Sequence, residues 1–124
     1  MMIFTSDHKR CVEISNSSLG SSLSELAAEI LSDEDKEFLQ YAVSFLNSSV
    51  CIADDAQITA RQLELAKRRF AKHLPPSHIT GSMNVSATSC ADLFITTDGK
   101  DLFDELICLL KYADKTSVDV FVER

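Results

Sequence analysis

The sequence predicts a single α+β domain over residues 1–124, with about four helices packed on a mixed or antiparallel sheet of four to six strands. A chain of 124 residues suits one domain with a core of its own. Short alternating segments occur near both ends of the chain, and segments with helical apolar spacing lie between them. Apolar residues make up 45% and charged residues 25%, which is typical of a folded globular protein.

The first third of the chain predicts a β-hairpin followed by a helix. Residues 2–4 are apolar and residues 11–14 alternate, with the polar sequence SDHK between them. From residue 23 to residue 31 the apolar side chains recur three and four positions apart, as on one face of a helix. Ser22 and Glu25 have the spacing of a capping box at the start of this helix.

A second helix is predicted from Asp33 to about Asn47. Ser32 is suited to cap it, and the acidic residues of its first turn favour the positive end of the helix dipole. The apolar residues 50–52 that follow fit either a short strand or a buried link, and the sequence leaves both interpretations open.

A third helix is predicted from Thr59 to about Leu74. Thr59 and Gln62 form another capping-box pattern, and Pro75 ends the helix because proline has no backbone donor and restricts the residue before it. The polar segment beyond it has room for an edge strand at residues 83–87.

The last third of the chain predicts a β-α-β unit. Residues 92–97 resemble a strand, Asp98-Gly99 a turn, and residues 100–113 a helix that is apolar around most of its circumference. The final segment, residues 118–123, alternates valines with Asp119, Phe121 and Glu123, which predicts a half-exposed strand.

Motifs for cofactor, metal or nucleophilic chemistry are not evident. Three glycines cannot build a dinucleotide-binding or phosphate-binding loop, and the sequence has no CxxC, HExxH or GxSxG pattern. We therefore expect no cofactor, no metal and no catalytic residue, with a small enzyme or ligand-binding domain of unrecognised site as the alternative hypothesis.

The four cysteines, at positions 11, 51, 90 and 108, show no close pair and no disulfide-like spacing. Three of them lie in apolar stretches, so buried free thiols are expected. The chain starts without an apolar signal segment and has no run long enough to cross a bilayer. These observations predict a cytoplasmic protein without membrane contact.

Charge is segregated along the chain. Residues 56–76 contain five basic residues and one acidic residue. The rest of the chain contains 7 basic and 18 acidic residues, so its net charge is -11, although that of the whole chain is -7. Cations near a helix C-terminus interact favourably with the dipole, which explains the basic helix structurally. The alternative hypothesis is nucleic-acid binding through Arg61, Lys67, Arg68, Arg69 and Lys72.

The acidic remainder is the predicted working surface. Acidic charge speeds association with a basic protein. We therefore expect a non-enzymatic protein-binding domain, and most specifically an immunity protein or inhibitor that neutralises a basic toxin, for example a nuclease, by occluding its active site. The candidate partner-binding residues are Asp33, Glu34, Asp35, Glu37, Asp98, Asp101, Asp104 and Glu105.

Overall fold

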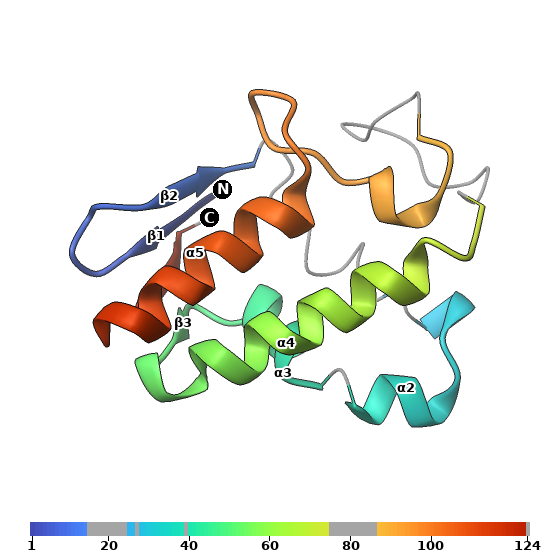
Figure 1. The fold of residues 1–124 in the computed structure, drawn as a ribbon, viewed down its shortest axis with the longest axis horizontal. Helices are drawn as coiled ribbons and strands as arrows, with labels where there is room; N and C mark the ends of the chain where they lie inside the picture. Colours follow the sequence, from blue (N-terminus) through green and yellow to red (C-terminus); the bar gives the residue numbers. More distant parts are fainter. Residues whose placement is uncertain (15–24, 27, 39, 75–86, 124) are drawn as a thin grey trace.

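The computed structural model describes residues 1–14, 25–26, 28–38, 40–74 and 87–123, which form an α+β fold with one antiparallel sheet (Figure 1). The fold class predicted from the sequence is thereby confirmed. The strands are β1 (Met2–Thr5), β2 (Cys11–Glu13), β3 (Val50–Cys51) and β4 (Val120–Glu123). The helices are α2 (Asp33–Phe38), α3 (Gln40–Asn47), α4 (Ala53–Phe70) and α5 (Leu102–Thr116), with a short 3-10 helix, η1 (Cys90–Asp92).

The sheet has the strand order β2-β1-β4-β3, with every neighbouring pair antiparallel. The predicted hairpin is confirmed as β1 and β2, with Ile3 opposite Val12. The last strand lies beside the first, with Ile3 also opposite Val122, and the short β3 pairs with the outer side of β4. Segments from opposite ends of the sequence therefore form the two central strands.

The helices and the sheet share one apolar core. Helix α5 packs on β1 and β2 and lies beside α4, which in turn contacts α3 (Figure 1). Phe70 of α4 and Phe103 of α5 meet edge to face with their ring centroids 5.7 Å apart. Leu106 and Leu110 of α5 are fully buried, as the apolar circumference of this helix predicts.

Helix α4 begins at Ala53, six positions before the predicted start, and ends at Phe70 rather than at Leu74. Its cap comes from a residue distant in the sequence, because the carboxylate of Asp119, which immediately precedes β4, accepts a hydrogen bond from the Ala53 amide at 2.9 Å. The predicted capping box at Thr59 and Gln62 is therefore wrong. Both residues lie inside the helix, where the Thr59 hydroxyl donates to the Asp55 carbonyl at 2.7 Å.

The predicted strand at residues 92–97 is also wrong, and no β-α-β unit forms there. Residues 90–92 are a 3-10 helix, and Ile95 makes only an isolated bridge to Asp101 across the Asp98-Gly99 turn. Leu93 and Phe94 owe their apolar character to burial in the core, where the Phe94 ring meets Phe103 edge to face.

Other elements of the first half of the chain agree with the predictions. The described residues of the predicted second helix form α2 and α3, which begin at Asp33 and end at Asn47, and the hydroxyl of Ser32 accepts from the Asp35 amide at 3.2 Å, as predicted. Residues 25–26 and 28–30 are helical, within the predicted first helix. Val50 and Cys51 form a short strand and not merely a buried link, which decides between the two interpretations of this segment. Ser22 and residues 83–86 of the predicted edge strand lie outside the described residues, and Ala87 is described without strand structure.

Candidate functional site

The basic end of α4 lies between two acidic segments of the same chain. The ammonium group of Lys67 is 2.7 Å from the Asp104 carboxylate and 3.6 Å from that of Asp101. The Nε atom of Arg69 lies 3.6 Å from the carboxylate of Asp35 in α2. Desolvation lowers the pKa of Lys67, but the hydrogen bond and charge of Asp104 and the charge of Asp101 outweigh it and leave that pKa raised. Two of the five basic residues proposed for nucleic-acid contact are therefore paired internally.

The other three basic residues point to solvent. Arg61, Arg68 and Lys72 are exposed, and none of them forms an ion pair with another described residue.

The predicted acidic residues divide into several environments. Asp101 caps α5 by accepting from the Asp104 amide at 2.9 Å. Asp98 precedes α5 in the turn, where the hydroxyl of Thr96 donates to it at 2.8 Å and lowers its pKa. Asp33 and Glu34 are exposed in the first turn of α2, and Glu37 belongs to the same helix. The structure thus uses several of these carboxylates within the fold.

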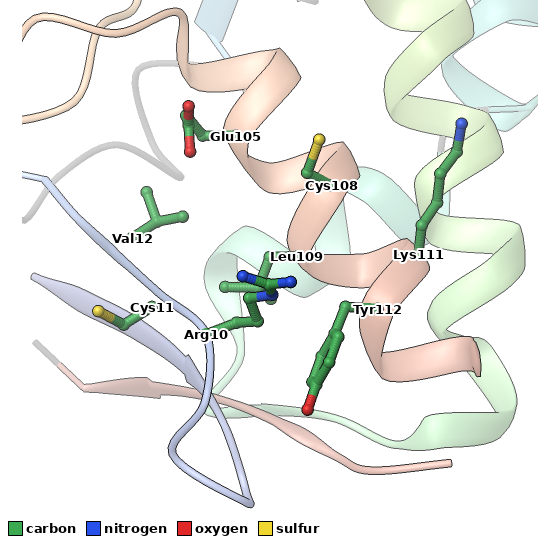
Figure 2. Close-up of a pocket in the computed structure, with 8 residues that line it drawn as sticks. All are labelled: Arg10, Cys11, Val12, Glu105, Cys108, Leu109, Lys111 and Tyr112. Atoms are coloured by element: carbon green, nitrogen blue, oxygen red, sulfur yellow. The ribbon is translucent and has the colours of Figure 1, made fainter. Parts of the chain in front are cut away.

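Glu105 differs from the other predicted acidic residues. It is half-buried on α5 and makes no side-chain hydrogen bond or ion pair within the described part of the chain. Its carboxylate lines a groove between α5 and β2 (Figure 2).

This groove consists of two adjoining depressions of about 440 and 350 Å³, which share Cys11, Val12 and Glu105. One wall is the outward side of α5, from Glu105 to Tyr112, and the opposite wall is β2 (Figure 2). The first depression also includes Arg10, whose guanidinium lies 5.0 Å from the centre of the Tyr112 ring. The second depression extends to the turn at residues 96–100.

A short polar network fixes the groove's Tyr112 end. The hydroxyl of Tyr112 donates to Asp7 at 2.6 Å, and the hydroxyl of Thr5 donates to the same carboxylate at 2.6 Å. These two hydrogen bonds lower the pKa of Asp7 to about 2. The hairpin turn is therefore tied to α5, which sets the distance between the groove walls.

The second surface feature is the side of the sheet that faces away from α5, which we call the outer face. No described helix covers it, and its residues are all exposed or half-buried. Phe121 is 37% exposed and Val50 is 42% exposed. The outer face consists of Met2, Phe4, Cys11, Glu13, Val50, Phe121 and Glu123.

The register aligns the apolar members of the outer face in one row. Phe4 lies opposite both Cys11 and Phe121, and Phe121 lies opposite Val50, so the row crosses all four strands. The ring centroids of Phe4 and Phe121 are 5.8 Å apart. The neighbouring row is Glu13, Met2 and Glu123, which places two carboxylates beside the apolar row.

The outer face was not among the residues proposed from the sequence. The alternation of residues 118–123 already placed Phe121 and Glu123 together on one side of a strand. What the sequence lacked was the strand order, which brings Phe4 and Val50 to either side of Phe121.

The four cysteines are free. Of the three in apolar stretches, only Cys51 is buried as expected, and Cys90, which lies outside those stretches, is buried as well. Burial raises the pKa of both thiols. Cys11 and Cys108 are exposed and both line the groove. Among the described residues, no group of three or more histidine, cysteine or acidic side chains is arranged to hold a metal ion.

No protein-family model, curated protein or solved structure matches this chain. None of the helices in the described ranges has the length and apolar content required to cross a membrane.

Proposed function

We propose that this chain is a non-enzymatic protein-binding domain that binds a basic protein through the outer face. The apolar row of Phe4, Phe121 and Val50 beside the carboxylates of Glu13 and Glu123 is the observation that supports this proposal. In its most specific form, the domain is an immunity protein that occludes the active site of a basic toxin such as a nuclease.

The outer face combines two properties of protein interfaces. Exposed aromatic residues supply an apolar centre, and removing that centre from water on binding lowers the free energy of the complex. Carboxylates at the border favour a partner with lysine and arginine residues, and the net charge of -7 increases the rate of encounter with such a partner. Pairing of Lys67 and Arg69 with carboxylates of the same chain reduces the repulsion that the basic segment exerts.

We further propose that the domain works in the cytoplasm. Cys11 and Cys108 are free and exposed, and exposed thiols persist unpaired in a reducing compartment.

The proposal is tested by identifying the stoichiometric protein partner in the cell of origin and measuring its binding to purified variants. Phe121→Ser is expected to weaken binding at least tenfold by removing the centre of the apolar row. Ile58→Ser is the matched control, because Ile58 is 40% exposed on α4 and lies outside the outer face. Glu13→Gln with Glu123→Gln is expected to slow association and to reduce its salt dependence.

For the immunity form, co-expression of the wild type is expected to protect cells from the partner, and Phe121→Ser is expected to lose protection. Recovery of only nucleic acid or small metabolites, or equal binding by the Phe121 and Ile58 variants, contradicts the proposal.

A further inference from the structure

We propose that the groove between β2 and α5 binds an extended segment of a partner protein, which adds to the sheet as a fifth strand beside β2 and places a lysine or arginine against Glu105. The inference rests on the proposed function only in taking a protein as the ligand. It uses the outward backbone groups of β2 and the side chains of α5, whereas the proposed function uses the side chains of Phe4, Phe121 and Val50.

The hydrogen-bond pattern of the hairpin leaves one side of β2 open. The Thr5 amide donates to the Arg10 carbonyl at 3.0 Å and the Ile14 amide to the Met1 carbonyl at 2.8 Å. Because pairing alternates along an antiparallel ladder, the backbone groups of Cys11 and Glu13 point away from β1. The outward carbonyl of Glu13 accepts from the Thr97 amide at 2.9 Å. Within the described residues, both backbone groups of Cys11 and the amide of Glu13 have no partner.

The opposite edge of the sheet is closed. At β3 the hydroxyl of Ser48 donates to the Val50 carbonyl at 2.8 Å and accepts from the Val50 amide at 3.2 Å. One side chain thus satisfies the outward donor and acceptor that a further strand would need. Only the β2 edge presents such a pair among the described strands, and this pair lies on the groove.

The groove offers two walls between which a strand can add beside β2. The first depression lies between β2 and α5 (Figure 2). The second depression shares Cys11 and Val12 with it and extends to Glu13. An added antiparallel strand accepts a hydrogen bond from the Cys11 amide and donates one to the Cys11 carbonyl. A second carbonyl of that strand accepts a hydrogen bond from the Glu13 amide. Main-chain bonds of this kind hold the segment, and the side chains that face α5 select its sequence.

Charge and spacing on α5 define that selection. The unpaired carboxylate of Glu105 favours a cationic side chain, and Leu109, four residues further along the helix, lines the same depression. Four helical residues span about 6 Å, which is close to the span of about 6.7 Å between alternate residues of a strand. A basic residue and an apolar residue two positions apart therefore match Glu105 and Leu109.

The direction of β2 sets the order of these two residues. Arg10 stacks on Tyr112 near the end of α5, whereas Glu13 shares a depression with Glu105 near its start, so β2 runs opposite to α5. An antiparallel added strand runs in the direction of α5. The expected segment therefore has the order basic, any residue, apolar.

The test selects binders from a random decapeptide library displayed on phage, with the whole chain immobilised as bait. We expect enrichment of peptides with the order basic, any residue, apolar. On addition of a synthetic peptide of the enriched sequence, the Cys11 and Glu13 amides are expected to become protected from hydrogen exchange.

Two variants assign the binding to the groove. Cys11→Pro removes the outward donor without using a bond of the β1 pairing, as edge strands tolerate. It is expected to weaken the peptide about tenfold or more, because it removes a hydrogen bond and adds bulk where the strand lies. Cys11→Ala is the control and is expected to bind as the wild type. Glu105→Lys keeps the backbone edge intact and is expected to replace the preference for basic peptides with one for acidic peptides.

The outcomes separate this inference from the proposed function. Peptide binding that survives Phe121→Ser and fails in Glu105→Lys supports the groove, whatever the outer face binds. The inference is overturned by a library without enrichment, or by peptides whose affinity is unchanged in both Cys11→Pro and Glu105→Lys. Self-association of the chain that is lost in Cys11→Pro also overturns it, because a second copy then occupies the edge.

Discussion

The side-chain oxygen of Gln62 on α4 accepts a hydrogen bond from the backbone amide of Ala42 on α3, at 3.0 Å. Ala42 lies in the first turn of α3, where backbone amides have no partner inside the helix. Gln62 is buried and thus serves as a cap for a neighbouring helix. Gln62→Leu is expected to lower the free energy of unfolding by about 1 to 2 kcal/mol, because it leaves a buried amide unpaired.

Urea denaturation measures this change. Gln57→Leu, at an exposed position of the same helix, controls for the general effect of leucine on α4 and is expected to be nearly neutral. Equal losses of stability in the two variants would contradict the capping role of Gln62.

Asp101 caps α5 and also neighbours Lys67, and two substitutions separate these contributions. Asp101→Ala is expected to destabilise the protein by about 1 kcal/mol through loss of the cap. Asp101→Asn removes the charge but keeps an acceptor that caps equally well, so it is expected to lose only a few tenths of a kcal/mol. Thermal unfolding of both variants at low and high salt measures these losses of stability. If Asp101→Asn loses as much stability as Asp101→Ala, and the loss depends on salt, the contribution of Asp101 comes from its charge and not from the cap.

The lowered pKa of Asp7 predicts how the stability of the protein changes at acidic pH. Its pKa is lowered from 3.8 to about 2 in the folded protein by its hydrogen bonds from Thr5 and Tyr112. A carboxylate with a lowered folded-state pKa contributes stability that is complete above its unfolded pKa and is lost as the pH falls through the folded value. We expect the wild type to lose this contribution between about pH 4 and pH 2, and Asp7→Asn to lack it throughout.

Stability measured from pH 5 to pH 2 in the two proteins tests this expectation. Tyr112→Phe removes one of the two donors and is expected to give an intermediate profile. Parallel profiles for the wild type and Asp7→Asn over that range would contradict the assignment.

The thiols are expected to react with an aromatic disulfide reagent in two groups. Cys11 and Cys108 are exposed and should react within the first phase. Cys51 and Cys90 are buried with raised pKa values, so their reaction should await denaturant. Cys11→Ser and Cys108→Ser should each remove one thiol from the fast phase, and a fast phase that keeps both would contradict this placement.

The sequence predicted those elements whose signals are local. The hairpin, the last long helix and the final strand each follow from alternation or helical spacing within a few residues. The start of α4 was misplaced because its cap, Asp119, is 66 residues away in the chain. A strand was wrongly predicted at residues 92–97 because the apolar side chains of Leu93 and Phe94 are buried in the core and do not belong to a strand.

The same distinction applies to the candidate surfaces. Alternation placed Phe121 and Glu123 on one side of a strand, and Glu105 was among the predicted acidic residues. The pairing of Lys67 with Asp104 spans 37 residues, so the sequence did not reveal which carboxylates the fold uses internally. The open edge at Cys11 depends on the register of β1 with β2, which composition and periodicity leave undetermined.

The pairing of β1 with β4 has a consequence for folding kinetics. Ile3 and Val122 are partners although they are 119 positions apart in the sequence, so the centre of the sheet closes a loop of nearly the whole chain. Such nonlocal contacts slow folding, because the entropy of loop closure is lost before the contacts form. The hairpin and the α4-α5 pair are more local, and β4 is needed to join the hairpin to β3. The outer face, which spans all four strands, is therefore expected to be complete only in the last, slowest phase of refolding.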